Sequence, residues 1–446
     1  MLIIEHPVFK SGNMDVDQDY HLSEKENGML LKSILNRIQL HHGFVYGSIR
    51  LVEKAKRLLL EIDIRPRKGS RPVCSVCGSS GPGYDTLPVR RFEFVPFWGI
   101  AVFFLYAMRR VDCPRCGVKV ERIPWAEGKN HLTTTYAWFL AKWAKRLSWK
   151  EVADAFQTKW DNVFRSVKMA VAWGLANRNL DNITAIGIDE ICWKKKGSKF
   201  LTLVYQIDDG CKRLLFIGKD RTKKTLMGFF DEFGPNRSSL LRFVCTDMWK
   251  PYLLVVAEKA GQALNILDRF HIMSHMNKAI DKVRATEAKT LKAKGNAVLT
   301  NSRWCLLKRP ENCTEKQTVK LQELVAINLK TVRAYLLKED FQRFWNYKSA
   351  GWAAKFLDQW CKRTMRSRID PMKKIAKMLR SHRGLILNWF RAKGQVALGA
   401  VEGLNNKAKV TTKKAYGFKS FEVIKLALYH TLGKLPEPEV THNFSN

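Results

Sequence analysis

Hydrophobic and polar positions follow several different periods along this chain of 446 residues, and the changes of period divide it into parts. Apolar residues at helical spacing in "SEKENGMLLKSILNRI" (23–38) predict a helix, and the alternating runs "FVYGSIRLV" (44–52) and "RLLLEIDIRP" (57–66) predict strands. The most apolar stretch, "FVPFWGIAVFFLYA" (94–107), has 14 residues, fewer than a membrane-spanning helix needs, and is broken by a proline and a glycine. It predicts two buried strands joined by a turn.

The pattern becomes helical again over residues 133–171. "TTTYAWFLAKWAKRL" predicts one amphipathic helix, and Ser148 and Glu151 form a capping box that opens a second. A short break then leads into a third helix, so the trio predicts a helix-turn-helix. Arg165 and Lys168, on the third helix, are candidate DNA contacts. A helical trio that serves only as a packing unit is the alternative.

Residues 183–270 combine strands with helices. Three β-like runs, "AIGIDEICW", "FLTLVYQID" and "CKRLLFIG", are joined by short turns at 196–198 and 208–210, so they predict an antiparallel meander. The order helix, strand, helix, strand follows in "TKKTLMGFFDEFG", "LLRFVCTD", "PYLLVVAEKAG" and "ALNILDRFH". This succession is the order of an RNase H-like fold. From residue 278 to about 393 only helical patterns and charged loops occur.

The net charge of the chain indicates its binding partner more strongly than its overall composition does. The chain has 78 Lys and Arg against 41 Asp and Glu, a net charge of +37. Residues 361–420 alone hold 16 Lys and Arg against Asp370 and Glu402. Such an excess, spread along the chain, favours a nucleic acid as the partner, with an anionic membrane surface as the competing interpretation. The first residues lack the pattern of a secretory signal, so we expect a cytoplasmic protein with reduced cysteines.

Four cysteines are arranged in two Cys-x-x-Cys pairs. Cys74 and Cys77 form the first, and Cys113 and Cys116 form the second, with β-rich sequence between them. Two such pairs match the tetrahedral thiolate coordination of structural zinc. The sequence therefore predicts one Zn²⁺ site, the alternative being four incidental buried thiols.

Carboxylates are scarce in this chain, yet Asp189 stands at what reads as the end of the first strand and Asp247 at the end of the fourth. These strands are neighbours in an RNase H-like sheet, so the two side chains are expected to meet at one edge. A pair of acids there suits Mg²⁺, and Glu402, on a helix filled with lysine and asparagine, is the best candidate for a third ligand. Taken singly, each acid could instead be a turn former, a helix cap or a solvated side chain.

These residues carry a resemblance. The motifs "IGIDE", "CTDMWKPY", "LDRFH" and "VEGLNNKAKVTTKKAYGF", with the cysteine pairs, resemble the DDE transposases of bacterial insertion sequences, in the ISL-three-like group. The resemblance covers nearly the whole chain from about residue 45. It implies that Asp189, Asp247 and Glu402 are the catalytic triad and bind Mg²⁺ or Mn²⁺. It also implies that Asp268 and His271 match a D-x-x-H element that supports catalysis.

The charge excess, the helical trio and the resemblance together suggest where DNA is bound. We expect double-stranded DNA, both transposon ends and target, to contact the lysines of the last catalytic helix and a tryptophan in the helical insertion, alongside the two residues of the third helix. The full set of candidate DNA contacts is Lys407, Lys409, Lys413, Lys414, Arg165, Lys168 and Trp304. A packed core position is the alternative for Trp304. Assembly as a homodimer or higher oligomer on DNA is expected, with no membrane partner.

The fold class predicted from these observations is a multidomain α+β protein. An N-terminal zinc ribbon and a helix-turn-helix precede an RNase H-like α/β catalytic core, which an all-α insertion interrupts. The expected domains are 1–70 (N-terminal helix and hairpin), 71–126 (zinc-binding), 127–180 (helix-turn-helix), 181–277 (first part of the catalytic core), 278–395 (helical insertion) and 396–446 (closing helix and tail).

The predicted function is that of a transposase that binds terminal inverted repeats, cleaves them with a two-metal mechanism and transfers strands, in the bacterial cytoplasm and on the nucleoid. A DNA-binding repressor or architectural protein derived from a transposase, and an RNase H-like nuclease without strand transfer, are the alternatives.

Overall fold

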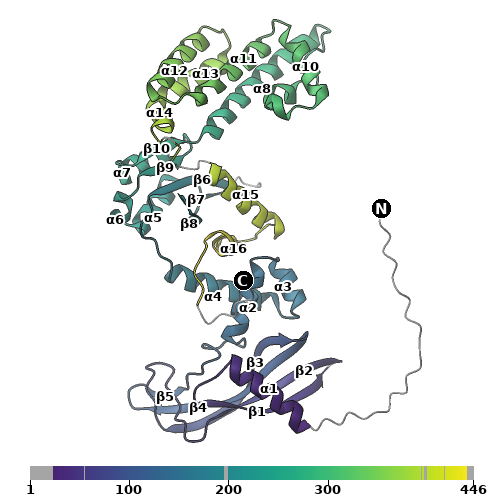
Figure 1. The fold of residues 1–446 in the computed structure, drawn as a ribbon, viewed down its shortest axis with the longest axis vertical. Helices are drawn as coiled ribbons and strands as arrows, with labels where there is room; N and C mark the ends of the chain where they lie inside the picture. The colour runs from purple at the N-terminus through teal and green to yellow at the C-terminus, as the bar shows by residue number, and fades with distance from the viewer. Residues whose placement is uncertain are drawn as a thin grey trace, which may run out of the picture. The chain divides into compact units, whose positions relative to one another are not determined.

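The computed structural model describes residues 24–54, 56–194, 199–392, 394–395, 399–415 and 417–438. These residues fall into two compact units, one reaching to Ser166 and the other spanning Val167–Pro438. Both units contain helices, and each has its own five-stranded sheet (Figure 1). The predicted mixed α+β, multidomain class is confirmed. The six domain boundaries stay predictions.

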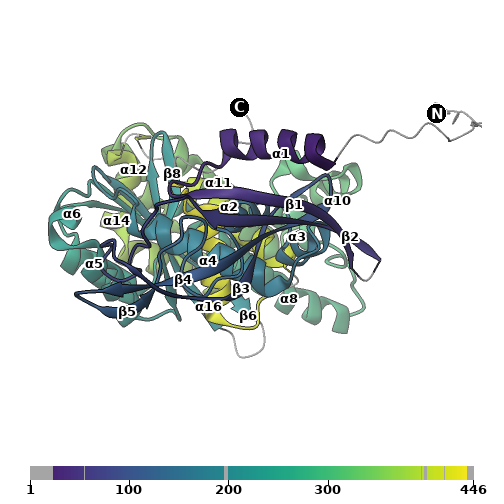
Figure 2. The ribbon, with the colours of Figure 1, turned by 90° about the horizontal axis from the view of Figure 1, so that it is seen from below.

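The first unit is built around the sheet of order β1-β2-β4-β3, with β5 paired to β4. In chain order, its elements from α1 to α3 are α1 (Glu24–Ile38), β1 (Phe44–Lys54), β2 (Arg57–Pro66), β3 (Gly83–Phe97), β4 (Ile100–Cys113), β5 (Gly117–Val120), α2 (Thr134–Ala144) and α3 (Trp149–Ala155). Figure 2 shows α1 along one face of this sheet, where Leu35 is fully buried. The predicted helix over 23–38 and the two predicted strands after it are confirmed within the described residues.

The most apolar stretch of the chain forms the hairpin of β3 and β4, as predicted. Its turn passes through Trp98 and Gly99, both with positive φ (47° and 79°). The long apolar run is thus explained by two strands whose side chains enter the core around Trp125, which is 1% exposed and packs edge-on against Phe44 and Tyr106.

The predicted helical trio consists of α2, α3 and α4 (Trp160–Ala176). The capping box is present in both directions: Glu151 N donates to Ser148 Oγ (3.3 Å), and Ser148 N donates to Glu151 Oε2 (2.7 Å). The local hydrogen bonds that start the second helix therefore follow directly from the sequence. A DNA-reading role for the trio stays a prediction.

The second unit has the strand order β10-β9-β6-β7-β8. The elements that build this sheet region are β6 (Ala185–Lys194), β7 (Lys199–Asp208), β8 (Cys211–Lys219), α5 (Lys223–Phe233), α6 (Pro235–Ser239), β9 (Phe243–Thr246), α7 (Lys250–Lys259) and β10 (Leu264–Leu267). β6, β7 and β8 form the predicted antiparallel meander, and β9 runs parallel to both β6 and β10. The turn at 208–210 is confirmed, with Gly210 at φ 81°. The turn predicted at 196–198 lies outside the described residues.

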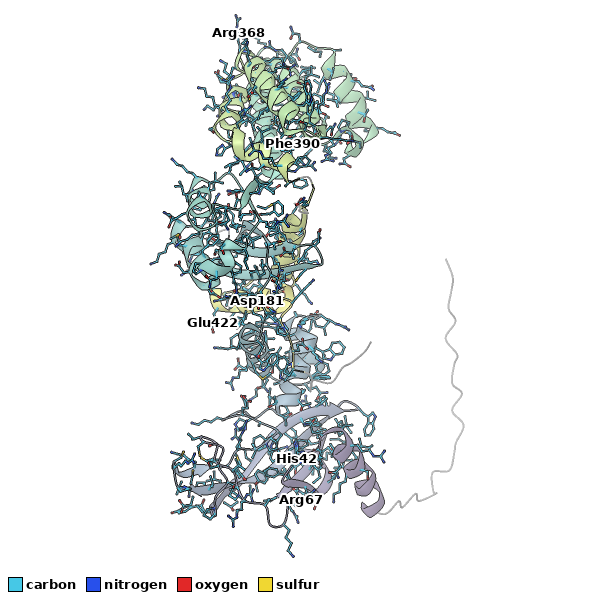
Figure 3. All side chains as sticks on the ribbon, turned by 60° about the vertical axis from the view of Figure 1, so that its left-hand side comes forward. His42, Arg67, Asp181, Arg368, Phe390 and Glu422 are labelled. Carbon is cyan, nitrogen blue, oxygen red and sulfur yellow. The ribbon has the colours of Figure 1, made fainter. Side chains whose placement is uncertain are left out.

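Helices make up the rest of the second unit, as predicted. They are α8 (Arg269–Ala293), α9 (Arg303–Leu307), η1 (Pro310–Asn312), α10 (Glu315–Val325), α11 (Lys330–Gln342), η2 (Arg343–Asn346), α12 (Ala350–Met365), α13 (Asp370–Ser381), α14 (Arg383–Arg391), α15 (Gly399–Lys414) and α16 (Phe421–Leu432). An aromatic core that includes Phe341, Trp360 and Phe390 (labelled in Figure 3) holds the helices from α8 to α14 together. Among the residues that the structure describes, none of the helices has the length and apolar character that a bilayer crossing requires.

Helix α15 lies against β6 and β7, and one glycine permits this close approach. A Cβ atom at Gly187 would collide with the Val401 side chain on α15. Any larger residue at position 187 would push α15 away from the strand, because buried van der Waals contacts leave no room to yield. The glycine in "IGIDE" therefore sets the position of the helix that carries Glu402.

Candidate active site

Three aspartates and a histidine line one small cavity beside the middle of β6 and the carboxyl ends of β9 and β10. These residues are Asp189, Asp247, Asp268 and His271. The cavity has a volume of about 10 Å³, room for roughly one water-sized atom. Because β6 and β9 are adjacent and parallel, Asp189 on β6 and Asp247 just after β9 come to the same cavity, which is the juxtaposition that the sequence predicts.

The prediction that Asp189 ends the first strand is wrong. β6 continues to Lys194 because it stays paired with β7. β9 pairs with β6 only from Ala185 to Gly187, so Asp189 lies just beyond that pairing, where its side chain is free to reach the cavity.

Burial dominates the electrostatics of this cavity. Desolvation raises the pKa of Asp189 above its usual range, although the backbone N–H of Glu190 donates to Asp189 Oδ1 at 2.7 Å and lowers it in part. Burial likewise raises the pKa of Asp268. His271 Nε2 lies 3.9 Å from Asp189 Oδ1 and 3.9 Å from Asp268 Oδ2, between the two carboxylates. Several acids held out of water at one point need a compensating cation, and carboxylate oxygens are the donors that Mg²⁺ prefers.

A chain of two hydrogen bonds, buried at its Tyr205 end, holds Asp189 from the side of α15. The Tyr205 hydroxyl on β7 donates to Asn405 Oδ1 at 2.8 Å, and Asn405 Nδ2 donates to Asp189 Oδ2. Tyr205 is fully buried and Asn405 is 5% exposed. The tyrosine fixes the orientation of the amide, so that its N–H faces the carboxylate.

Glu190 and Asp247 share a cation on the other side. Arg221, in the loop between β8 and α5, places Nε 2.6 Å from Glu190 Oε2 and a terminal nitrogen 2.9 Å from Asp247 Oδ2. Burial, with Asp247 as the next contribution, raises the pKa of Glu190 to about 7. Successive residues of a strand face opposite sides, so Glu190 points toward Arg221 and away from Asn405, the partner of Asp189.

Glu402 is an exposed residue in the first turn of α15. Its helix contributes Val401 to the cavity wall, and its charge is one of the influences that raise the pKa of Asp268. Within the described part of the chain, the acids are not gathered as closely as the four cysteines, which form the one group whose ligand atoms all lie within 4.8 Å of one another.

The cysteine cluster joins both predicted pairs, Cys74 with Cys77 and Cys113 with Cys116. Cys77 Sγ and Cys113 Sγ are 3.4 Å apart. Hydrogen bonds with Ser79 lower the pKa of Cys77 to about 6, whereas the hydrogen bond with Cys77 raises the pKa of Cys116 to about 12. The thiols therefore compete for charge, and a bound divalent cation would remove the conflict by accepting four thiolates. The donor set fits zinc.

The candidate DNA contacts are found on exposed surfaces. The side chains of Lys407, Lys409, Lys413 and Lys414 are exposed along α15. Arg165 and Lys168 are exposed on α4, but Lys168 Nζ is paired with Glu422 Oε1 at 3.1 Å. Trp304 is 54% exposed, with the Arg303 guanidinium 5.3 Å from its ring centre, so the core alternative for this tryptophan is wrong.

Sequence reasoning missed the partners of the acids. Asn405 follows Glu402 by three residues on one helix, so its place on the same face could have been inferred from the motif. Nothing singles out Arg221 among 78 Lys and Arg residues, nor Tyr205 in an apolar strand. Both depend on the register of the folded sheet.

A sheet that brings buried carboxylates to one cavity, in a chain of net charge +37, is typical of enzymes that process nucleic acids. Comparison with known families is more specific. Residues 186–428 match the DDE transposase family of the ISL3 group, and the chain belongs to this transposase family. The resemblance inferred from the motifs is confirmed.

Individual relatives carry the same description. The chain is 27% identical over 354 residues to the transposase for insertion sequence element IS1001 of Bordetella parapertussis, a match that covers 78% of this chain and 86% of that protein. It is 29% identical over 410 residues to the transposase for insertion sequence element IS1557 of Mycobacterium tuberculosis, covering 85% of this chain and 90% of that protein. Both matches extend well beyond residues 186–428.

Proposed function

We propose that this protein binds the terminal inverted repeats of an insertion sequence, cleaves the DNA there and transfers the strands to a target. The observation that carries the proposal is the cavity at the edge of the second sheet, which Asp189, Asp247 and Asp268 line. The strand order β10-β9-β6-β7-β8, with the meander antiparallel and the outer pair parallel, supports an RNase H-like catalytic core.

Asp189, Asp247 and Glu402 would hold the divalent metal ions, Mg²⁺ or Mn²⁺. The ions would supply activation of the attacking oxygen and charge stabilisation of the leaving oxygen of an in-line displacement at phosphorus. The chain's own residues orient this set: Asn405 fixes Asp189, and Trp249 N donates to Asp247 Oδ1 at 3.0 Å. His271, between Asp189 and Asp268, is positioned to hydrogen-bond a phosphate oxygen or a carboxylate.

DNA binding is assigned to the exposed cations. The α15 lysines 407, 409, 413 and 414 would contact phosphates next to the cavity, and Trp304 would stack against a base or sugar. On α4, Arg165 is the stronger candidate for reading base edges, because Lys168 already has a carboxylate partner. The four-cysteine cluster would hold one structural Zn²⁺. We place the reaction in the bacterial cytoplasm, with the protein assembled as a dimer or higher oligomer on nucleoid DNA.

The decisive experiment uses purified full-length protein and duplex DNA that ends in the inverted repeats flanking the gene. Asp189→Asn, Asp247→Asn and Glu402→Gln each preserve shape while removing a charged oxygen ligand. Each should reduce Mg²⁺-dependent nicking and strand transfer by at least ~10³-fold, with end binding retained. Asp209→Asn is the matched control, since Asp209 is exposed in the β7–β8 turn. Asp208 is unsuitable because its carboxylate accepts hydrogen bonds from Thr184 and Gln206.

The outcomes separate the candidate functions. Nicking without any strand-transfer product would indicate an RNase H-like nuclease. End binding with no cleavage in Mg²⁺ or Mn²⁺ would indicate a repressor or architectural protein. Robust cleavage by Glu402→Gln would remove Glu402 from the triad and leave Glu190 and Asp268 as the remaining acids beside Asp189.

A further inference from the structure

Arg221 joins two acids at the edge of the proposed active site, and several contacts fix its position. Its guanidinium makes ion pairs with Glu190 (2.6 Å) and Asp247 (2.9 Å), the latter with hydrogen-bond geometry. The same group lies 4.3 Å from the ring centre of Trp249. The three charged side chains are only 28%, 14% and 10% exposed, so the contacts are shielded from bulk water.

The backbone that carries Arg221 is fixed by hydrogen bonds with the neighbouring strand β7. Asp220 has φ 67°, a left-handed conformation that aspartate tolerates better than most residues. Its carbonyl accepts a hydrogen bond from Thr202 Oγ1 at 2.7 Å, and its N–H donates to Phe200 O at 3.0 Å. The Thr202 hydroxyl is also 2.7 Å from the Tyr252 hydroxyl, and both side chains are fully buried. The loop therefore delivers the guanidinium to one place.

This arrangement leaves Asp247 occupied. Oδ1 accepts from Trp249 N and Oδ2 accepts from Arg221. A divalent cation that binds Asp247 must enter beside a fixed positive charge, which repels it across a partly buried site. The cation and the guanidinium therefore compete for the Asp247 carboxylate oxygens.

We propose that Arg221 is an internal cation that competes with the divalent metal for Asp247, and that a DNA phosphate takes over the guanidinium when the ends are bound. The inference rests on the proposed function, because it assumes that Asp247 is a metal ligand. Arginine suits the exchange, since its planar fork pairs with carboxylate and phosphate in the same geometry. Metal loading is then coupled to DNA binding, and by linkage each must strengthen the other by the same factor.

The test measures Mn²⁺ affinity by electron paramagnetic resonance on zinc-loaded, full-length protein, with no turnover required. For the wild type, a pre-cleaved duplex of the element end should tighten Mn²⁺ binding on the order of tenfold, within the range usual for coupled sites. Arg221→Gln, which keeps a planar polar group over Trp249 but loses the charge, should bind Mn²⁺ about tenfold more tightly without DNA, and DNA should add little. Arg221→Lys should fall between, because one ammonium cannot bridge both acids.

Lys223→Ala is the matched control. It removes one positive charge two residues away, from an exposed lysine whose partner is Glu258 at 3.4 Å. Its Mn²⁺ affinity should equal that of the wild type. Equal or weaker Mn²⁺ binding by Arg221→Gln would overturn the exchange and leave Arg221 as a purely structural counter-ion.

Asp189→Asn distinguishes the two levels of failure. If this variant binds Mn²⁺ as the wild type does, the carboxylates are not the metal site and the proposed function fails together with the inference. If Asp189→Asn abolishes binding while Arg221→Gln does not tighten it, only the exchange is wrong. A circular dichroism spectrum of each variant identifies any loss of folding, and Arg221→Lys then serves as the reporting variant.

Discussion

Replacing Asn405 tests whether helix α15 fixes the orientation of the Asp189 carboxylate. Asn405→Ala removes two hydrogen bonds, a partly buried one to Asp189 and a buried one from Tyr205. A hydrogen bond to a charged group contributes roughly 1.5–3 kcal/mol and a neutral one about 1 kcal/mol. The second unit should therefore lose roughly 2–4 kcal/mol of unfolding free energy. At ~2–4 °C per kcal/mol for a unit of this size, its transition should move down by roughly 5–15 °C in scanning calorimetry.

The chain supplies a matched control and a partner for a double-mutant cycle. Asn406, the next residue of α15, is exposed, so Asn406→Ala should leave the transition within about 1 °C of the wild type. Tyr205→Phe removes only the hydroxyl and should cost about 1 kcal/mol or somewhat more. The double variant should be no less stable than Asn405→Ala alone, because the tyrosine loses its acceptor once Asn405 is gone.

Cleavage rates complete this test. Asn405→Ala should slow Mg²⁺-dependent nicking at least ~10-fold with end binding unchanged, since the orientation of Asp189 is lost while the DNA surface is intact. Additive effects of the Tyr205 and Asn405 changes on stability would refute the proposed chain of hydrogen bonds. Equal behaviour of Asn405→Ala and Asn406→Ala would refute the positioning role altogether.

Three further expectations concern other parts of the chain. Metal analysis should return about one zinc per chain, and Cys74→Ser should lower it and make the first unit melt earlier, because structural zinc supplies folding energy. Changing Lys407, Lys409, Lys413 and Lys414 together to glutamine should weaken DNA binding. The magnitude of the slope of log affinity against log salt should fall by about 3–4, because each phosphate that is no longer neutralised lowers it by roughly 0.9. An unchanged slope would show that α15 does not contact the DNA. Burial lowers the pKa of His41 to about 4. Between about pH 6.5 and 4 the unfolded chain therefore binds a proton that the folded chain does not. The unfolding free energy of the first unit should fall by about 3 kcal/mol as the pH falls through this range. Urea unfolding of His41→Phe against wild type at several pH values checks this, and an identical pH slope for both would contradict it.

The sheet of the second unit was predictable from local signals. Period-two alternation marks β6, β7 and β8, and the short turns between them leave the antiparallel meander as the simple solution. The helical periods that follow then force the parallel arrangement of β9 and β10, because crossover connections return a strand in the same direction. This reasoning locates Asp247 correctly. It puts Asp189 at the end of β6, which is wrong, because the sequence does not show that β6 continues beyond its pairing with β9.

Among the side-chain partners of the acids, Asn405 is within reach of the motif, whereas Arg221 and Tyr205 are not predictable, and the reason is physical. Asp189 and Glu190 are neighbours in sequence, yet the pleat sends one toward Asn405 on α15 and the other toward Arg221 in the β8–α5 loop. Each partner arrives from a segment whose position depends on a different feature: the left-handed turn at Asp220 for Arg221, and the space left by Gly187 for α15. A change at Gly187 would therefore disturb Asp189 and Glu402 together without touching either side chain. Gly187→Ala should be as damaging to cleavage as loss of a carboxylate, and this dependence of chemistry on one missing Cβ is visible only once the helix and the strand are seen packed together.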